Sequence, residues 1–327
     1  KARELYGYLI KPVEKEIDGV KDLCIVPDKS LHFLPFAALF SGSDRYLFQS
    51  HSLSYAPSAS VLIRCLKEDE GFAVGGLEKI LSVGNPRFNS EDFPNLQSLV
   101  DAETEADRSA RYYAPGSVTL RGAQATEPLV RSAMRGCDVA HLGVHCLVDD
   151  SSPWLAALVL AGSSQKAPAS GLGSGPASDS KADATSKGIP TRSAALTKAM
   201  PSEKAVDPND GLLYLNELYG MKLPHTRLVV LSACQTGLGQ YYRGEGIVSL
   251  VRPLLAAGVP TVVASLWSVD SKATSDLMIE FHRQRKLNTG TRAAEALRLA
   301  QAELAKTYEH PYYWAPFIVV GGRSASR

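Results

Sequence analysis

Short apolar runs alternate with amphipathic stretches along most of this chain. The runs that predict strands, rich in aliphatic and β-branched residues, are Leu23–Val26, Ile80–Val83, Ser117–Leu120, Val139–Val144, Leu155–Leu160, Leu228–Leu231, Thr261–Leu266 and Phe317–Val320. Apolar positions spaced by three and four residues predict helices over Ala59–Lys67, Glu103–Tyr113, Glu127–Arg135, Gly246–Ala257, Ser271–Arg285 and Thr291–Lys306. Because buried strands that alternate with helices form βαβ crossovers, we expect an α/β fold with a mostly parallel sheet. Several late strands are apolar throughout, which is typical of a sheet sandwiched by helices on both faces.

One long segment, from about residue 163 to 210, interrupts this pattern. It is rich in Ser, Ala, Gly, Pro and Lys and contains no aromatic residue. Such a composition cannot bury enough apolar surface to offset the entropy lost on ordering, so it predicts a long disordered insertion. The basic residues of the insertion raise the hypothesis that the protein cleaves itself there, and a surface loop without that role is the favoured alternative.

Composition and charge exclude several classes of protein. The chain has 327 residues, and 35 Lys and Arg against 34 Asp and Glu give a net charge of +1, so no basic footprint for nucleic acid is visible. No uninterrupted apolar run is long enough to span a membrane, and we expect no membrane contact. The N-terminus lacks an initiator Met and a signal peptide, so we expect a piece of a longer polypeptide.

The cysteines indicate a reducing compartment. The five are Cys24, Cys65, Cys137, Cys146 and Cys234, an odd number without a CxxC pair. This spacing argues against both a disulfide framework and a structural zinc site. The default expectation is therefore a cytoplasmic protein without a bound metal.

Two strand ends carry residues with catalytic chemistry. The strand Val139–Val144 runs into His145, and the strand Leu228–Leu231 runs into Ser232-Ala233-Cys234. In open parallel sheets, ligands and catalytic groups collect just beyond the carboxyl ends of the strands. If the two strands are neighbours, an imidazole and a thiol therefore share one crevice, where the imidazole can take the thiol proton.

Two other interpretations of these strands are weaker. His141 competes with His145 as the base, but it lies four residues deeper in the strand, so we expect it to pack or hydrogen-bond within the sheet. The alternating pattern would also fit a flavodoxin-like nucleotide binder. That alternative is rejected because the chain has no P-loop and no GxGxxG at a strand–helix turn.

Long motifs in both halves of the chain resemble one family. The string VVLSACQTGLGQYYRGEGIVSLVRPLLAAGVPTVVASLWSVDSKATSDLM and the later HPYYWAPFIVVGG are similar to the CHAT domain signature. The N-terminal strings LCIVPDKSLHFLPFAAL, LSYAPSASVL and LSVGNP agree with the first half of that family. CHAT domains belong to the caspase and separase clan of cysteine peptidases and are often fused behind tetratricopeptide repeats. The resemblance implies a caspase-like fold with an N-terminal half at 1–115 and a catalytic half at 116–327.

The resemblance also assigns catalytic roles. Cys234 matches the family's nucleophile, and His145 matches the catalytic His. The residue after that His is normally Gly, whose backbone N–H forms the oxyanion hole together with the N–H of the nucleophile. Here it is Cys146, which retains the N–H but would be strained at a positive φ.

The loop after the strand Thr261–Leu266 supplies the expected substrate-binding residues. In caspase-like folds this loop pairs with an extended peptide, so Ser265 and Trp267 are candidates for its walls. Asp270 is a candidate for binding a basic side chain, with a role as helix cap as the alternative. Asp149 and Asp150 are further candidate acids, and Tyr241–Gly246 is a candidate mobile loop beside the cleft or a plain connector.

These observations together favour a cysteine endopeptidase that acts on a protein substrate through a His-Cys dyad. The chemistry needs no metal or cofactor. The resemblance further implies an upstream partner-binding region, such as tetratricopeptide repeats or a regulatory protein. The alternative is a catalytically weak or inactive scaffold for protein interaction, which the Gly-to-Cys replacement after His145 would support.

Overall fold

The computed structural model describes residues 1–42, 44–72, 77–147, 156–162, 210–233, 246–268, 270–322 and 325. Its strands are β1 (Asp22–Ile25), β2 (Ser52–Tyr55), β3 (Ile80–Pro86), β4 (Val118–Gly122), β5 (Val139–Gly143), β6 (His145–Leu147), β7 (Ala157–Val159), β8 (Leu212–Tyr214), β9 (Leu228–Leu231), β10 (Thr261–Ser265) and β11 (Phe317–Gly321). Its α-helices are α1 (Ala2–Leu9), α2 (Glu14–Ile17), α3 (Leu47–Ser50), α4 (Ala59–Glu70), α5 (Val100–Ala110), α6 (Glu127–Gly136), α8 (Leu215–Gly220), α9 (Gly246–Ala256), α10 (Ser271–Leu287) and α11 (Ala293–Leu304). Among the described residues, no helix combines the length and apolar character needed to cross a membrane.

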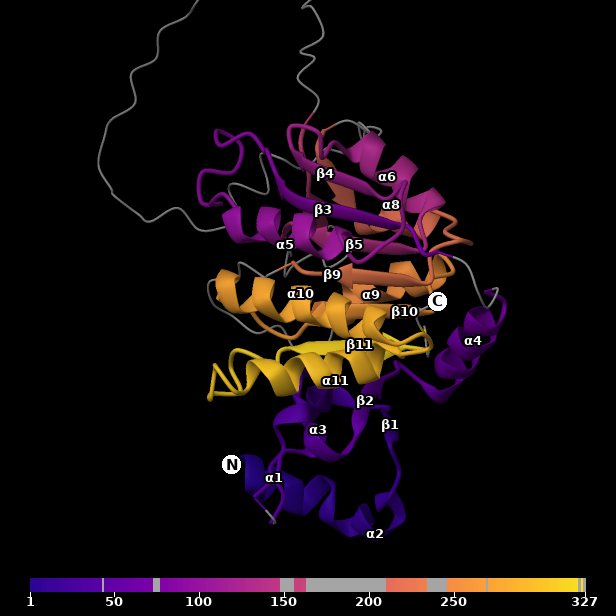
Figure 1. The fold of residues 1–327 in the computed structure, drawn as a ribbon, viewed down its shortest axis with the longest axis vertical. Coiled ribbons are helices and arrows are strands. Elements are labelled where there is room, and N and C mark those ends of the chain that lie inside the picture. The colour runs from indigo at the N-terminus through magenta and orange to yellow at the C-terminus, as the bar shows by residue number, and fades with distance from the viewer. Residues whose placement is uncertain are drawn as a thin grey trace, which may run out of the picture.

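A central sheet of eight described strands has the order β1-β2-β11-β10-β9-β5-β3-β4. The neighbours from β10 to β4 run parallel to one another, and so do β1, β2 and β11. The two blocks meet at the antiparallel pair β10–β11. The sheet therefore extends from β4 at the top of Figure 1 to β1 near the bottom, and it is mostly parallel as the sequence predicts.

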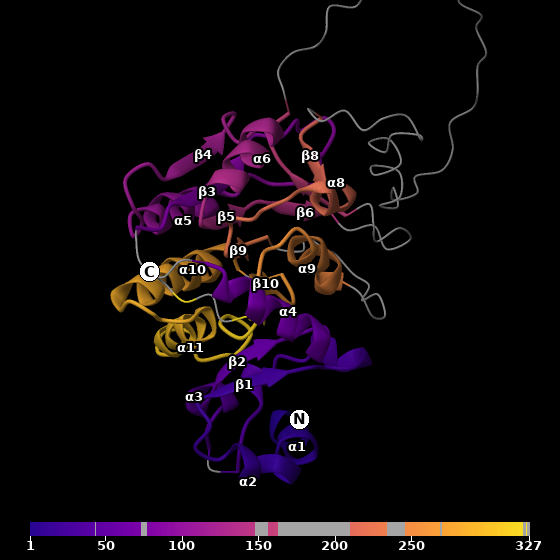
Figure 2. The same ribbon diagram turned by 90° about the vertical axis from the view of Figure 1, so that its right-hand side faces the viewer.

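Helices cover both faces of this sheet. α5, α10 and α11 lie side by side on the face toward the viewer in Figure 1, and α4, α8 and α9 lie on the opposite face, as the turned view in Figure 2 shows. The strands between them are buried along their whole length in β5, β9, β10 and β11. The expected α/β fold with a sheet sandwiched by helices is confirmed.

A second, antiparallel sheet of β6, β7 and β8 begins directly after β5. The predicted strand Leu155–Leu160 contains β7, which belongs to this small sheet and not to the central one. An apolar run does not show which of the two sheets a strand joins, because strands of both sheets are buried; all three residues of β7 are buried in the small sheet.

The two ends of the predicted insertion meet at this small sheet. The N–H of Leu160 donates to the carbonyl of Gly211 at 2.7 Å. Gly211 has a φ of +85°, and a Cβ there would lie 2.8 Å from the nitrogen of Gly162. Gly162 and Gly211, on either side of the predicted insertion, therefore lie beside each other. The insertion itself lies outside the described residues, apart from Asp210.

Candidate active site

β5 and β9 are direct neighbours in the central sheet. They run parallel, with His141 opposite Val230 and Leu142 opposite Leu231. Their carboxyl ends therefore open at the same edge of the sheet, which confirms the neighbouring strands that the sequence prediction required. The chain beyond β5 continues directly into β6, whose first residue is His145. Beyond β9 the description ends at residue 233, so Cys234 lies outside the described residues.

The ring of His145 is held on one side by a backbone carbonyl. His145 is 3% exposed, and its Nε2 lies 2.6 Å from the carbonyl oxygen of Gln97. Phe88 contacts the ring edge-to-face, with ring centroids 5.5 Å apart. Because a carbonyl oxygen can only accept, Nε2 carries the hydrogen, and the lone pair of the neutral ring is on Nδ1. Nδ1 is buried and has no hydrogen-bond partner among the described residues.

Burial also sets the charge of this ring. Loss of hydration disfavours the imidazolium form and lowers the pKa of His145 below its ordinary value of 6.5, while the hydrogen bond to Gln97 acts weakly in the opposite direction. The ring is therefore neutral at pH 7. A neutral imidazole with a free Nδ1 is a proton acceptor.

Sequence reasoning did not identify the contacts made by Gln97 and Phe88. The hydrogen bond from His145 goes to a backbone oxygen, which every residue type carries, so no side-chain pattern marks Gln97. Phe88 lies in the connection between β3 and α5, which has no periodicity. The carbonyl of Gln97 orients the His, and this role is visible only in the fold.

Cys146 occupies its position without backbone strain. It lies in β6 opposite Leu158. The non-glycine residues with positive φ in the described chain are Lys29, Asp44 and Asn85, so the replacement of Gly by Cys146 forces no left-handed conformation. Its thiol is buried, and the loss of hydration raises its pKa to about 12. This cysteine is therefore a poor nucleophile, whatever its backbone N–H contributes.

Two predicted substrate-binding residues lie at the carboxyl end of β10, and the first of them, Ser265, contacts the chain just beyond β9. Ser265 is buried, and its hydroxyl donates to the carbonyls of Ala233 at 3.5 Å and Trp267 at 3.2 Å. The Trp267 indole donates from Nε1 to the carbonyl of Tyr312 at 3.2 Å, and the two rings stack. The hydroxyl of Tyr312 donates to Ser268, so the loop after β10 is tied to the segment before β11. The sequence pattern did not point to Tyr312.

Asp270 caps a helix. Its Oδ1 accepts a hydrogen bond of 3.0 Å from the N–H of Ala273 in the first turn of α10, and the residue is exposed. This contact is the one expected under the capping alternative. The other acidic candidates, Asp149 and Asp150, and the loop 241–245 lie outside the described residues.

His141 is part of a buried polar network on the α5 and α10 face of the sheet. Its Nδ1 lies 3.1 Å from Nε2 of His282, and its Nε2 lies 2.8 Å from a carboxylate oxygen of Glu105. The other ring nitrogen of His282 contacts the hydroxyl of Tyr113 at 2.7 Å. His141 is fully buried, as predicted for a packed residue, and its ring nitrogens face this network.

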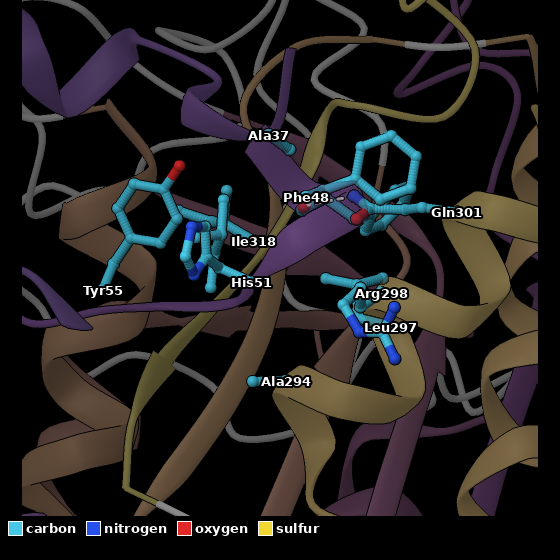
Figure 3. A pocket seen from close by; sticks show the side chains of 11 residues that line it. Ala37, Phe48, His51, Tyr55, Ala294, Leu297, Arg298, Gln301 and Ile318 are labelled. Atoms are coloured by element: carbon cyan, nitrogen blue, oxygen red, sulfur yellow. Dashed lines mark hydrogen bonds between the residues drawn. The ribbon is translucent and has the colours of Figure 1, made fainter. Parts of the chain in front are cut away.

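The described residues form two pockets, one away from this site and one that borders it. Figure 3 shows the first, between β2 and α11, where His51 and Tyr55 line one side and Arg298 and Gln301 the other. Two of its polar groups already have partners, because His51 contacts the carbonyl of Val20 and Gln301 donates to Trp314. Phe317 and Ile318 of β11 also line this pocket, and β10 lies between β11 and β9. A second, mostly apolar pocket lies on the opposite face, where Val251 of α9 and Leu266, the residue between Ser265 and Trp267, form part of its wall.

Comparisons with known proteins agree with this architecture. Gingipain R (RgpB) of Porphyromonas gingivalis, an Arg-specific cysteine proteinase, is 9% identical, with a TM-score of 0.53 over 100% of this chain and 68% of its own. The separase of the Saccharomyces cerevisiae separase–securin complex is 13% identical, with a TM-score of 0.53 over 98% of this chain and 17% of its own. Both likenesses concern the fold alone, and the architecture is that of the caspase-like α/β proteins.

The family is defined by sequence. The CHAT domain model matches residues 1–322, and the chain belongs to the CHAT domain family. Tetratricopeptide repeat protein 28 of Mus musculus and that of Homo sapiens are each 27% identical over 98% of this chain. The chain spans only 13% of the length of these relatives.

Proposed function

We propose that this CHAT domain is a cysteine endopeptidase in which His145 activates Cys234. The observation that carries the proposal is the parallel pairing of β5 with β9, with Leu142 opposite Leu231. His145 follows Leu142 by three residues, and Cys234 follows Leu231 by three residues. Because both residues stand three positions beyond a pair of residues that face each other on adjacent strands, His145 and Cys234 are expected to lie close together at this edge of the sheet.

The chemistry follows from the ring of His145. Its free Nδ1 takes the proton of the Cys234 thiol, and the thiolate attacks the carbonyl carbon of the scissile peptide. The imidazolium then gives the proton to the leaving amine, and water releases the acyl-enzyme. The backbone N–H groups of Cys146 and Cys234 are the proposed donors to the oxyanion. The hydrogen bond from Nε2 to Gln97 is available in both charge states of the ring and keeps its orientation through the cycle.

The substrate is proposed to lie along the carboxyl end of β10. Ser265 fixes the backbone of this loop, and Trp267 with Tyr312 offers an apolar wall. Asp270 is exposed, and only its Oδ1 is involved in the helix cap, which leaves its negative charge available to a Lys or Arg side chain of the substrate. A preference for a basic residue before the scissile bond follows as a proposal.

The cellular setting is proposed on two observations. The relatives that this chain matches are named for tetratricopeptide repeats, and the chain covers 13% of their length, which favours a neighbouring repeat region that binds or restrains partners. Cys24, Cys65, Cys137 and Cys146 are free thiols, which supports a reducing compartment such as the cytoplasm.

Peptide cleavage profiling of the purified chain beside Cys234→Ala and His145→Gln tests the catalytic assignment. We expect a loss of kcat/KM of at least about 10⁴-fold in each variant, because nucleophile and base act as a unit. Cys24→Ser is the matched control, since Cys24 lies in β1 at the far end of the sheet. Asp270→Asn retains a capping oxygen and removes the charge, so it should weaken cleavage after basic residues only.

Alkylation with iodoacetamide separates the endopeptidase from the scaffold alternative without a substrate. In the Cys24→Ser background, label should enter Cys234, and His145→Gln should slow the labelling. Cys146 should remain unlabelled, because its buried thiol has a pKa of about 12. Cleavage that persists in Cys234→Ala, or a labelling rate of Cys234 that does not depend on His145, would refute the endopeptidase.

A further inference from the structure

Asn85 has an unusual backbone conformation at the carboxyl end of β3, the strand beside β5. Its φ is +49°, in the left-handed region that non-glycine residues rarely occupy. The pairing of β3 with β4 shifts register between Gly84 and Pro86, so the irregularity is centred on this residue. A conformation of this kind costs free energy and persists only where surrounding contacts fix it.

The contacts that fix Asn85 involve the segment before α5. Its Oδ1 accepts a hydrogen bond from the N–H of Leu99 at 2.8 Å and another from the hydroxyl of Ser98 at 3.0 Å. Its Nδ2 lies 3.3 Å from a carboxylate oxygen of Glu103 in α5. One side chain therefore joins the end of β3 to both the segment before α5 and the helix itself.

The residue before Ser98 is Gln97, whose carbonyl accepts the hydrogen bond from His145. Gln97 and Ser98 are themselves exposed, so their side chains are not anchored in the core. Leu99, the N-cap residue of α5, has no side-chain cap of its own. The amide of Asn85 supplies the attachment for the backbone that presents the carbonyl of Gln97 to the imidazole.

We propose that Asn85 is a positioning residue for His145. It fixes the segment 97–99, and through the carbonyl of Gln97 it fixes the plane of the imidazole and the direction of the free Nδ1. The effect on catalysis rests on the proposed function, whereas the effect on the ring does not. The Asn of the LSVGNP string thereby has a physical role, because its side chain holds the backbone that presents the carbonyl of Gln97 to His145.

Three variants isolate this role. Asn85→Gly removes the amide and tolerates the positive φ, so the backbone conformation remains accessible. The double variant Asn85→Asp with Glu103→Gln keeps a side-chain oxygen at position 85 that accepts from Leu99 and Ser98. In its contact with α5 the direction of the hydrogen bond is reversed, because the amide at position 103 donates to the carboxylate at position 85. Asn89→Gly is the matched control, because Asn89 makes its own side-chain hydrogen bonds in the same connection, to Glu91 and Asp92.

The readout is hydrogen exchange of the His145 Nε2–H, followed by NMR and assigned by its loss in His145→Gln. We expect exchange in Asn85→Gly to be at least about tenfold faster than in the unaltered chain, because this substitution removes all three hydrogen bonds of the Asn85 side chain. The double variant should restore slow exchange, and Asn89→Gly should leave it unchanged. Ser98→Ala removes one of the two hydrogen bonds that Asn85 Oδ1 accepts, and it should give a smaller increase in the exchange rate. Because Ser98 is exposed, this variant replaces Asn85→Gly as the test if Asn85→Gly does not fold.

Unchanged exchange in folded Asn85→Gly, or in Ser98→Ala where that variant is the test, would overturn the positioning role. An equal acceleration of exchange in Asn89→Gly would overturn it as well, because the effect would then reflect general loosening of the connection. The outcome is distinct from that of the proposed function. If Asn85→Gly releases the ring while the alkylation rate of Cys234 stays constant, Asn85 positions His145 but the endopeptidase mechanism fails.

Discussion

Glu127 in the first turn of α6 is a buried acid whose charge depends on pH near neutrality. It is fully buried; its Oε1 accepts a hydrogen bond of 2.9 Å from Arg131, and its Oε2 has no hydrogen-bond partner among the described residues. Burial raises its pKa to about 7, with smaller upward contributions from the charges of Glu217 and Asp210 and an opposing effect of Arg131. Arg131 also contacts Glu217 at 2.6 Å and so connects α6 to α8.

This carboxyl group makes the free energy of unfolding depend on pH. Its folded pKa of about 7 exceeds the ordinary value of 4.5, so the folded chain retains a proton that the unfolded chain releases. The stabilisation of the fold by the protonated Glu127 is therefore complete below pH 4.5 and is lost as the pH rises to 7. At 1.36 kcal/mol per pKa unit, the free energy of unfolding falls by roughly 3 kcal/mol over this range. Urea unfolding across this range, for the unaltered chain and Glu127→Gln, should show the decline in the former alone. Parallel curves would contradict the assignment.

The packing of α5 on the sheet depends on the absence of a side chain at two glycines, Gly84 and Gly143. A Cβ at Gly84 would lie 2.3 Å from the carbonyl oxygen of Ala102 and 2.8 Å from the Cβ of Ala106. A Cβ at Gly143 in β5 would lie 3.1 Å from the Cβ of Ala102. The helix therefore approaches β3 and β5 closely enough to bring the segment before it, with Gln97, against the strand ends.

Gly84→Ala should destabilise the fold by about 3 kcal/mol, because the contact is with backbone that cannot move without shifting α5. Gly7→Ala is the matched control: its Cβ meets nothing within 4 Å, and the substitution in helix α1 should stabilise by about 0.5–1 kcal/mol. Thermal or urea unfolding of the two variants measures the difference. Equal effects at the two positions would show that the close approach of α5 is not required.

The sequence predicts the buried elements well because their apolar character is local. Runs such as Leu228–Leu231 and Thr261–Leu266 coincide with β9 and β10 to within one residue. The strand β2, which reads Ser-Leu-Ser-Tyr, is short and half polar and was not predicted. The order of the strands in the sequence also does not predict that β9 lies between β5 and β10 in the sheet, because the spatial order follows from the packing of the whole sheet.

In the candidate site too, features carried by side chains can be predicted from the sequence and features of the folded backbone cannot. His145 was a candidate because an imidazole at a strand end is a side-chain signal that the sequence provides. The carbonyl of Gln97 and the φ of Asn85 could not, because both are properties of the backbone in its folded path. Tyr312 was missed because its contact with Trp267 joins segments that are adjacent only once β11 pairs with β10.

At the scale of the whole molecule, a buried ion pair joins α10 to the start of β3. Arg285 is fully buried and binds both carboxylate oxygens of Glu78, at 2.7 and 2.8 Å. Lys286 and Arg227 lie 3.1 and 3.6 Å from the same carboxylate. Burial raises the pKa of Glu78, but the charges and hydrogen bonds of Arg285 and Lys286 together outweigh it and hold the pKa below its ordinary value. These contacts connect the C-terminal helices with the N-terminal part of the sheet.

Removal of Arg285 should therefore weaken the whole fold. We expect Arg285→Met to lower the free energy of unfolding by about 3–5 kcal/mol, because it leaves a buried carboxylate with weaker partners. Arg283→Met is the matched control, since Arg283 is partly exposed and pairs with Glu280 one turn away; its cost should stay below about 1 kcal/mol. Urea unfolding gives both values, and a cost for Arg285→Met no larger than that of the control would refute a stabilising role of the pair.

The close approach of Gly162 and Gly211 also makes the small sheet a place where the chain can be reconnected. The antiparallel pair β7–β8 holds these two residues beside each other, so a short Gly-Ser linker from Gly162 to Gly211 has little distance to span. A chain shortened in this way should retain the pairing of β7 with β8, because the hydrogen bonds of that pair join residues outside the replaced span.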